Sequence, residues 1–537
     1  MGQSKKYFGV MLDCSRNAVM KPEEVINYAK ILKSFGYNML QLYTEDTYEV
    51  NNEPYFGYLR GGYKKAEIKE IDEYCKQKGI ELIPCIQTLA HIRNIFRYSV
   101  YDSVRDFGDI LLIDESRTYE LIENMFSTLA ECFTSRKVHI GMDEAFMVGL
   151  GNYRTKHGIC DRYDLLVRHL NKVVEIAKKY NFHPMMWSDM FFRMSNNGEY
   201  YVNKTEIPED VISKIPDVSL VYWDYYHRHK MDYANMIKAH KQFNKDIWFA
   251  GGAWTWNGFA PSNDIALKTM KPAMDACREK GVNQIFLTLW GDNGKECSYF
   301  TVLPSLYYIK RYYEGEKDRN KIAQEFEKLT GESFDKMFFF DNANYVGGNR
   351  DGFNNPSKFM LYNDPFFGWF DSVCQEQVPN EFRKLSNRYL KYSRQSKNYG
   401  YIFDMYSKLC RVLYTKYDLG VKARAAYQDK DAMKLKEVVA TFKKTEKAVK
   451  EYIYSFRNLW YKENKPSGLE IHDLRLGGLL QRLRTCRERI ESYLDGKIDS
   501  IEELEEVLLD YWCGKADAKK TPAYLDWSGA ITANNIS

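Results

Sequence analysis

The sequence predicts an α/β fold: a (β/α)8 TIM barrel over residues 1–318, followed by an α-helical C-terminal domain over residues 319–537. Three observations support this prediction. Up to about residue 315, short apolar runs alternate with amphipathic stretches. After about residue 320 the strand-like runs stop. A chain of 537 residues is also too long for one ordinary hydrophobic core, so we expect at least two domains.

Eight apolar runs of strand length are interpreted as the barrel strands, at residues 7–12, 38–43, 81–86, 137–140, 183–187, 218–223, 246–250 and 284–289. Helical patterns lie between them, at residues 68–78, 117–133, 161–180, 232–243, 265–280 and 302–313, with a weaker one near 207–214. The first helix begins near Lys21-Pro22-Glu23-Glu24, because an early proline and acidic residues favour a helix start. An open doubly wound sheet is the alternative, but Leu12-Asp13-Cys14-Ser15-Arg16 is not the glycine-rich turn that it requires.

The region after the barrel has two parts. Residues 333–375 are rich in Phe, Asn and Gly and are expected to be irregular. Beyond them, apolar residues recur at helical spacing, which predicts helix packing rather than a ligand site. These stripes are Met405, Leu409, Val412 and Leu413, and then Val438, Phe442, Val449, Ile453 and Phe456.

Composition narrows the classes of function. A net charge of +4, from 77 basic and 73 acidic residues, gives no reason to expect a nucleic-acid or membrane partner. Eleven cysteines without metal-ligand spacing, and an N-terminus without a signal-peptide pattern, predict free thiols and a cytoplasmic protein. The nine histidines also lack ligand spacing, so we expect no metal and no other cofactor. The sequence does not indicate the oligomeric state.

Polar and indole side chains follow every predicted strand. In TIM-barrel enzymes the chemistry lies at the carboxyl ends of the strands. Indoles beside carboxylates suit a sugar, because the apolar face of the ring stacks on indole while its hydroxyls bond to charged groups. In chain order these residues are Asp13 and Arg16, Glu45 and Asp46, Gln87 and His91, Asp143 and Glu144, Trp187 and Asp189, Trp223 to Tyr225, Trp254 and Trp256, and Trp290 and Asp292.

Asp143 and Glu144 are adjacent carboxylates after the fourth predicted strand. Their repulsion raises the pKa of at least one of them, as a general acid requires near neutral pH. The alternative is a pair that caps the next helix. Spacing alone does not separate these two interpretations.

At this point the chain resembles glycoside hydrolase family 20. That family carries His-x-Gly-Gly-Asp-Glu after the fourth strand, and His139-Ile140-Gly141-Met142-Asp143-Glu144 stands here. The resemblance covers about residues 7–315 and includes three weaker matches: Leu12-Asp13-x-x-Arg16, then Arg60-Gly61-Gly62-Tyr63 followed by Ile83-Pro84 and His91, and Trp290-Gly291-Asp292. It is closest to a compact branch of the family with an N-terminal barrel and a C-terminal helical domain.

The resemblance implies a retaining exo-β-N-acetylhexosaminidase that removes terminal β-linked N-acetylglucosamine or N-acetylgalactosamine from an oligosaccharide or glycoconjugate. It further implies substrate-assisted catalysis through an oxazolinium ion. Glu144 is then the general acid/base, Asp143 orients the acetamido group, and a tyrosine hydroxyl bonds the acetamido oxygen. The implied substrate-binding residues are Arg16, Asp13, His91, Trp187, Trp223, Trp254, Trp290 and Asp292.

The sequence departs from the family pattern at two positions of the site. Met142 replaces the second glycine of the motif, and Gly251-Gly252-Ala253-Trp254 stands where the family has Tyr-x-Asp. Tyr225 is therefore our candidate for the tyrosine. Two other functions remain open. One is a barrel β-glycosidase with a protein nucleophile, and Asp189, Asp224 or Asp292 are the candidates for it. The other is a sugar-binding barrel without turnover.

Overall fold

The computed structural model describes residues 6–202, 207, 209–344, 355–374, 378–511 and 526–529. The chain divides into two compact units. The first unit comprises Met1–Ala253, Ile265–Gly291 and Ser305–Ile322. The second comprises Trp254–Asp264, Asp292–Pro304 and Ala323–Ser537. Its first two segments are the stretches of chain that follow the seventh and the eighth strand of the barrel. The domain boundary at residues 318/319 stays a prediction.

The first unit contains a closed barrel of eight parallel strands in sequence order. The barrel closes where β1 pairs with β8, in a register that runs from Tyr7 opposite Gln284 to Leu12 opposite Leu289. Every predicted strand is confirmed to within two residues at either end. The strands are β1 Tyr7–Asp13, β2 Met39–Tyr43, β3 Glu81–Cys85, β4 Lys137–His139, β5 His183–Trp187, β6 Ser219–Trp223, β7 Ile247–Gly252 and β8 Gln284–Leu289.

Large side chains fill the barrel interior. Successive residues of a strand point to opposite faces, so alternate positions of each strand meet at the axis. The interior cluster is Tyr7, Met11, Met39, Tyr43, Ile83, Cys85, Met185, Trp187, Val221, Trp248, Ala250 and Phe286. Trp223 and Trp290 pack against this cluster and are partly exposed. The barrel interior is therefore a packed core. Toward the carboxyl ends of the strands this core includes the aromatic side chains of Tyr43 and Trp187.

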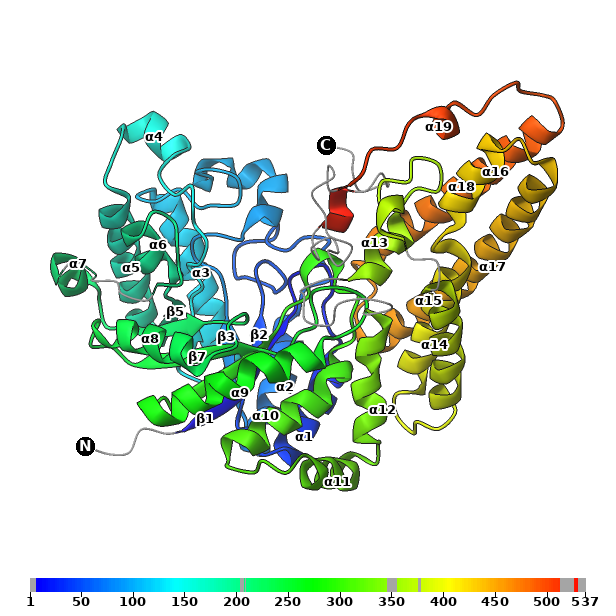
Figure 1. Ribbon diagram of the computed structural model, residues 1–537. Helices are drawn as coiled ribbons and strands as arrows, with labels where there is room; N and C mark the ends of the chain where they lie inside the picture. The colour runs from blue at the N-terminus through cyan, green and yellow to red at the C-terminus, as the bar shows by residue number, and fades with distance from the viewer. Residues whose placement is uncertain are drawn as a thin grey trace. The chain divides into compact units, whose positions relative to one another are not determined.

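Helices surround the strands (Figure 1). The predicted helices are confirmed, and α1 begins at Pro22 with Glu23 and Glu24 in its first turn. Asp161 caps α5 by accepting the backbone N–H groups of Tyr163 and Asp164. The helices up to the end of the barrel are α1 Pro22–Ser34, α2 Lys65–Gln77, α3 Ser116–Cys132, α4 Asn152–His157, α5 Arg162–Lys179, α6 Asp189–Ser195, α7 Glu209–Lys214, α8 Lys230–Lys241, α9 Asn263–Lys280 and α10 Leu303–Tyr313.

Long helices pack in succession in the second unit, in the order α14, α15, α17 and α18. The predicted stripes are buried there, except that Ile453 is only half-buried beside the buried Tyr452. The later helices are α11 Arg319–Thr330, α12 Phe334–Phe338, α13 Pro356–Tyr362, α14 Val378–Ser393, α15 Gly400–Lys416, α16 Leu419–Gln428, α17 Ala432–Glu463, α18 Leu469–Leu494 and α19 Glu502–Glu505.

The expectation of an irregular segment over residues 333–375 is wrong in part. The structure forms the short helices α12 and α13 within it, while residues 345–354 lie outside the described residues. Every residue of α13 is buried. Tertiary packing thus overrides the weak helix propensity of this composition.

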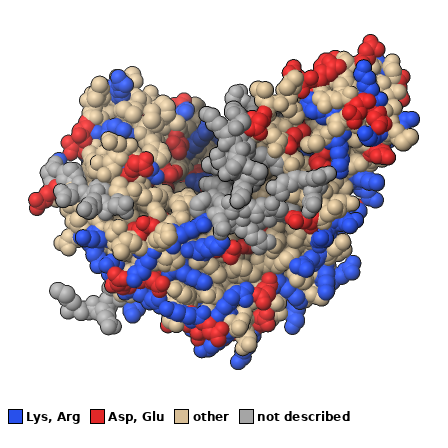
Figure 2. All heavy atoms as spheres, in the orientation of Figure 1, with Lys and Arg blue, Asp and Glu red and all other residues tan. Residues whose placement is uncertain are grey.

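Charge is mixed on the molecular surface. Figure 2 shows Lys and Arg side chains interspersed with Asp and Glu on the face that it displays. This mixing matches a net charge of +4. Within the described part of the chain, no helix combines the length and the apolar character needed to cross a bilayer.

Candidate active site

The loop after β4 carries Asp143 and Glu144 on an unusual backbone. Gly141, Met142 and Glu144 all have positive φ angles, of 72°, 71° and 50°. A Cβ atom on Gly141 would stand 2.0 Å from Oε1 of Gln87, so only glycine fits there. Met142 and Glu144 adopt a left-handed backbone conformation, which is unfavourable by about 1–2 kcal/mol for each non-glycine residue. Strain of this kind is found at functional sites where the surroundings hold it.

Asp143 is buried and held from two sides. Its Oδ1 accepts a hydrogen bond from Nε2 of Gln87 at 2.8 Å, and its Oδ2 lies 3.3 Å from Nε2 of His91. Burial alone would raise the pKa of Asp143, but the charge of His91 and these contacts outweigh it and lower that pKa to about 2. Burial would likewise lower the pKa of His91, but Asp143 more than offsets it and raises the pKa to about 9. Asp143 is therefore a carboxylate at neutral pH.

Glu144 has the opposite electrostatics. Its side chain is 39% exposed, and its Oε2 lies 3.7 Å from Nε2 of His91. Burial of the carboxyl group and the neighbouring charge of Asp143 raise the pKa of Glu144, against the positive charges of His91, Arg193 and Arg16. Two adjacent carboxyl groups with pKa values moved apart are the pattern of an acid beside a permanent anion.

A chain of polar contacts extends from Asp143 across the barrel rim. Gln87 also donates to the hydroxyl of Tyr43 at 2.9 Å, and Tyr43 donates to Oε1 of Glu45 at 3.2 Å. Nε of Arg16 lies 3.2 Å from the same Glu45 oxygen. Burial raises the pKa of Glu45 to about 7, although Arg16 opposes this. The loops after β1, β2, β3 and β4 are thus joined by one network.

Aromatic rings form the other side of the rim. Tyr225 stacks on Trp223 with ring centroids 5.4 Å apart, and Trp290 lies 4.8 Å edge-on from Tyr43. The guanidinium group of Arg16 lies 5.7 Å from the Trp290 ring. Burial raises the pKa of the Tyr225 hydroxyl well above its usual value, against hydrogen bonding with Trp290 and Thr288, and the charge of Asp143 raises it further.

Two predicted site residues, Asp13 and Trp187, have clear structural contacts. Asp13 accepts the backbone N–H groups of Ser15 and Arg16 through Oδ1, and that of Gly291 through Oδ2 at 2.9 Å. Asp13 therefore joins the loops after β1 and β8. Trp187 is 1% exposed and lies in the barrel interior, 4.4 Å from His139, and its indole nitrogen is buried without a hydrogen-bond partner. Burial lowers the pKa of His139 to about 3, so its ring is neutral and part of the core.

Trp254 and Asp292 belong to the second unit. Trp254 is fully buried and stacks on Trp256, with ring centroids 4.3 Å apart. Asp292 opens the short 3-10 turn Asp292–Gly294. The structure thus brings together the predicted residues of the first unit and places these two in the other compact unit.

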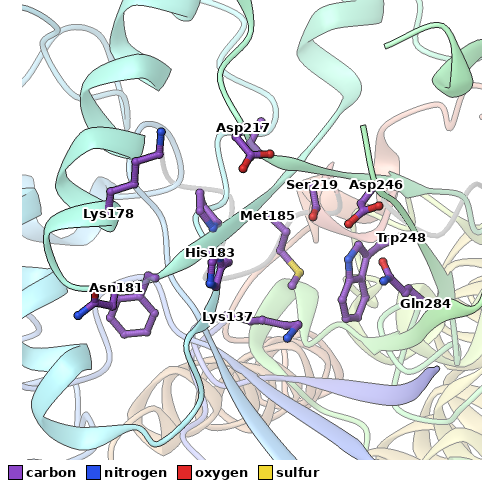
Figure 3. Close-up of a pocket in the computed structure, with 13 residues that line it drawn as sticks. Lys137, Lys178, Asn181, His183, Met185, Asp217, Ser219, Asp246, Trp248 and Gln284 are labelled. Atoms are coloured by element: carbon purple, nitrogen blue, oxygen red, sulfur yellow. The ribbon is translucent and has the colours of Figure 1, made fainter. Parts of the chain in front are cut away.

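A pocket of about 500 Å³ lies at the opposite end of the barrel. Its lining includes residues at or just before the starts of β4 to β8, among them Lys137, His183, Ser219, Asp246 and Gln284 (Figure 3). None of the predicted site residues lines it. The amino ends of TIM-barrel strands serve stability rather than chemistry, so this pocket is not the candidate active site.

Gln87, Tyr43 and Asp189 make contacts at the site that the sequence did not predict. Gln87 was placed at the end of the third strand but was given no function, and Tyr43 was not considered. Asp189, a rival nucleophile in the sequence analysis, accepts the backbone N–H of Glu144 at 3.2 Å. The polar residue at a strand end was the available signal in the case of Gln87 and Asp189. The groups that Gln87 and Asp189 contact lie on loops after other strands. The sequence of one strand does not specify which loops lie beside it.

Residues 6–212 match the model of the glycosyl hydrolase family 20 catalytic domain, and residues 333–522 match that of the glycoside hydrolase 20C C-terminal domain. Hexosaminidase D of Homo sapiens and of Bos taurus are each 26% identical over 212 residues, which is 36% of this chain. The matches cover 40% and 56% of those proteins, so the chain spans about half the length of the curated relatives that it matches.

One solved structure, a β-N-acetylhexosaminidase, is 14% identical with a TM-score of 0.48, covering 63% of this chain and 77% of that one. The two family models identify the chain, because one matches residues 6–212 within the barrel region and the other matches residues 333–522 within the helical region. The chain belongs to glycosyl hydrolase family 20.

Proposed function

We propose that this protein is a retaining exo-β-N-acetylhexosaminidase that acts by substrate-assisted catalysis. One arrangement carries the proposal: on a family 20 barrel, buried Asp143 is held by Gln87 at 2.8 Å and lies 3.3 Å from His91, directly beside Glu144. These surroundings lower the pKa of Asp143, whereas the pKa of Glu144 is raised. The reaction needs one carboxylate that stays ionised and one carboxyl group that still holds its proton near neutral pH. The substrate is an oligosaccharide or glycoconjugate with a terminal N-acetylhexosamine.

The first step closes the acetamido group onto its own ring. The carbonyl oxygen forms a bond to the anomeric carbon while the bond from that carbon to the leaving oxygen breaks. Glu144 donates its proton to the leaving oxygen. Asp143 accepts the acetamido N–H and stabilises the positive charge of the oxazolinium ion. Because the nucleophile is part of the substrate, the step gains from a high effective molarity.

The second step restores the sugar with its original configuration. Glu144, now a carboxylate, accepts a proton from water as the water oxygen attacks the anomeric carbon. The bond to the acetamido oxygen breaks, and the acetamido group is regenerated. Glu144 is protonated again and the cycle closes without any net change in the protein.

The other rim residues are proposed to bind the sugar. Tyr225 bonds the acetamido oxygen, and its stacking on Trp223 fixes the direction of its hydroxyl. Arg16, held by Glu45, binds ring hydroxyls. His91 keeps Asp143 ionised. The remaining proposed binding residues of the first unit are Asp13, Trp187, Trp223 and Trp290. For Trp254 and Asp292, which belong to the second unit, sugar binding stays a prediction.

A panel of nitrophenyl glycosides tests this function directly. We expect turnover of N-acetyl-β-glucosaminide or N-acetyl-β-galactosaminide and none of β-glucoside, because the glucoside lacks the acetamido nucleophile. A thiazoline that mimics the cyclised intermediate should inhibit competitively. Turnover of β-glucoside alone would instead favour a protein nucleophile, and sugar binding without any turnover would favour a binding protein.

We also propose that the protein works in the cytoplasm. Ten cysteines in the described residues are free, and most of them are buried. Unpaired thiols in such number suit a reducing compartment. Fluorescence microscopy of the tagged full-length chain, scored against a compartment marker, tests this proposal.

A further inference from the structure

Asp189 lies directly behind the candidate acid. It begins α6, immediately after β5, and is 0% exposed. Its Oδ2 accepts the backbone N–H of Glu144 at 3.2 Å and lies 3.2 Å from Nε of Arg193, one helical turn away. Its Oδ1 is buried without a hydrogen-bond partner. A carboxyl group buried in this way is costly, so its retention needs an explanation beyond packing.

The Glu144 backbone is the group that Asp189 contacts. With φ at +50°, Glu144 adopts a conformation that an L-residue seldom holds unless its surroundings enforce it. On the other side of the residue, the carbonyl oxygen of Glu144 accepts the N–H of Phe146 at 2.7 Å. The bond from Glu144 N–H to Asp189 therefore fixes the peptide that precedes the strained residue. Any rotation of that peptide would turn the Glu144 carboxyl group away from its present direction.

Arg193 fixes Asp189 in turn. Its Nη1 donates to the carbonyl oxygen of Gly198 at 2.9 Å, and its guanidinium group lies 5.0 Å from the Phe146 ring. The same group lies 5.7 Å from the Tyr200 ring and 6.0 Å from the Trp223 ring. Arg193 thus connects the loop that carries Glu144 with α6 and with the aromatic side of the rim.

We propose that Asp189, held by Arg193, is the positioning residue that aims Glu144 at the leaving oxygen. It touches neither substrate nor reacting atoms in the proposed mechanism, and it acts through the Glu144 peptide. This inference rests on the proposed function, because it assigns Asp189 to the acid step of that reaction.

Electrostatics give Asp189 a second effect on the same step. Burial raises the pKa of Asp189 to about 7, with Asp143 and Glu144 adding to the rise and Arg193 opposing it. The charged groups that affect Glu144 are Asp143, which raises its pKa, and His91, Arg193 and Arg16, which lower it. Above about pH 7, where Asp189 is mostly ionised, it adds negative charge beside Glu144. Removing that charge should lower the pKa of Glu144 and leave it ionised at a lower pH.

The dependence of kcat/KM on the leaving group distinguishes a misplaced acid from a general loss of active-site structure. A poor leaving group needs its proton at the transition state, whereas an activated one departs almost unaided. We would measure kcat/KM for aryl N-acetyl-β-glucosaminides from dinitrophenyl to phenyl, with Asp189→Ala, Asp189→Asn and Arg193→Met in the full-length chain. For Asp189→Ala we expect a loss of about 10²-fold on the phenyl substrate and less than about tenfold on the dinitrophenyl substrate.

Asp189→Asn keeps an oxygen that can accept the Glu144 N–H but removes the charge. It should lose less activity than Asp189→Ala, and the basic limb of its kcat/KM profile should move to lower pH. Arg193→Met should show the same leaving-group trend as Asp189→Ala, because Asp189 loses its anchor. Circular dichroism and the melting midpoint of each variant establish that the chain is folded.

Asp224 provides the matched control. It is also 0% exposed, follows β6 directly, and is held by the N–H of Tyr226 and by Nδ1 of His227. Asp224→Asn should change all leaving groups by one common factor. The inference is overturned if Asp189→Ala and Arg193→Met also lower kcat/KM for the whole series by one common factor. If Asp189→Ala does not fold, Asp189→Asn takes its place in this comparison. A wild-type chain without activity on any N-acetylhexosaminide would instead contradict the proposed function.

Discussion

His91 and Asp143 form an ion pair at the carboxyl end of the barrel, with Nε2 of His91 lying 3.3 Å from Oδ2 of Asp143. The same nitrogen lies 3.7 Å from Oε2 of Glu144. One imidazolium group therefore affects both carboxyl groups of the proposed mechanism. It lowers the pKa of the one that must stay ionised and limits the rise of the one that must hold a proton.

Glu144→Gln should remove the proton donor and keep the shape of the side chain. We expect turnover of substrates with poor leaving groups to fall by about 10²–10⁴-fold, which is the usual contribution of general acid–base catalysis. Substrates with activated leaving groups should lose less in the first step. Steady-state kinetics on phenyl and dinitrophenyl N-acetylglucosaminides measure this. Equal losses on both substrates would argue against Glu144 as the acid.

Asp143→Asn should slow ring closure for every substrate. The amide can still accept from Gln87, but it no longer offers a negative charge to the acetamido N–H. We expect a fall in kcat/KM of about 10²–10³-fold, similar to the loss of one electrostatic stabiliser in other active sites. Affinity for a thiazoline inhibitor should fall in parallel. An unchanged rate and an unchanged inhibition constant would remove Asp143 from the acetamido role.

His91→Gln should move both limbs of the pH profile to higher pH. The proposed mechanism requires Asp143 ionised and Glu144 protonated, so we expect kcat/KM to fall below the pKa of Asp143 and above that of Glu144. Loss of the His91 charge raises the pKa of Asp143 from about 2 and also raises that of Glu144. The pH dependence of kcat/KM for one activated substrate measures both shifts.

The same variant should change how stability depends on pH. The pKa of His91 is raised from 6.5 to about 9, so its contribution is complete below pH 6.5 and is lost as pH rises through 9. The pKa of Asp143 is lowered from 3.8 to about 2, so its contribution is lost as pH falls through that range. Wild type should exceed His91→Gln in melting temperature most clearly between these ranges. His169→Gln is the control, because buried His169 has a pKa lowered to about 4 and stays neutral.

The barrel could be predicted from the sequence because each of its strands is recognisable from a short stretch of consecutive residues. Each strand is a short apolar run, and polar or indole residues follow each run within a few positions. The site network could be predicted only in part. Gln87 reaches Asp143 because β3 and β4 are neighbours in the barrel, and Asp189 reaches Glu144 because the backbone of Glu144 has positive φ. A glutamate gives no sequence signal for that conformation, whereas Gly141 does.

Met142 illustrates the same limit. It replaces a glycine of the family motif, and the structure holds it at φ 71°. Its N–H donates to Oε1 of Gln87 at 3.2 Å, and its side chain is fully buried. Tertiary contacts thus offset the strain that the missing glycine would have avoided. Short helices such as α13 were missed for a related reason, because their stability comes from burial rather than from propensity.

A buried ion pair in the second unit should control the stability of the loop that follows β8. Nζ of Lys358 lies 2.6 Å from Oε2 of Glu296, with both side chains 1% exposed, and 3.9 Å from the Trp527 ring. Lys358→Met would leave Glu296 buried with Arg475 at 3.5 Å as its remaining cation. Breaking a buried pair by removing one partner costs about 3–5 kcal/mol. Scanning calorimetry of the full-length chain should therefore show a lower melting temperature for the variant.

Two further variants test whether the lower melting temperature of Lys358→Met comes from the unneutralised charge of Glu296. Glu296→Gln combined with Lys358→Met removes both charges and should recover much of the lost stability, because a matched neutral pair needs no desolvation of ions. Lys443→Met breaks the pair with Glu491 on the surface, where the lysine side chain is 60% exposed, and should leave the melting temperature almost unchanged. A double variant as unstable as Lys358→Met alone would mean that the lysine acts by packing against Trp527, and not by neutralising Glu296.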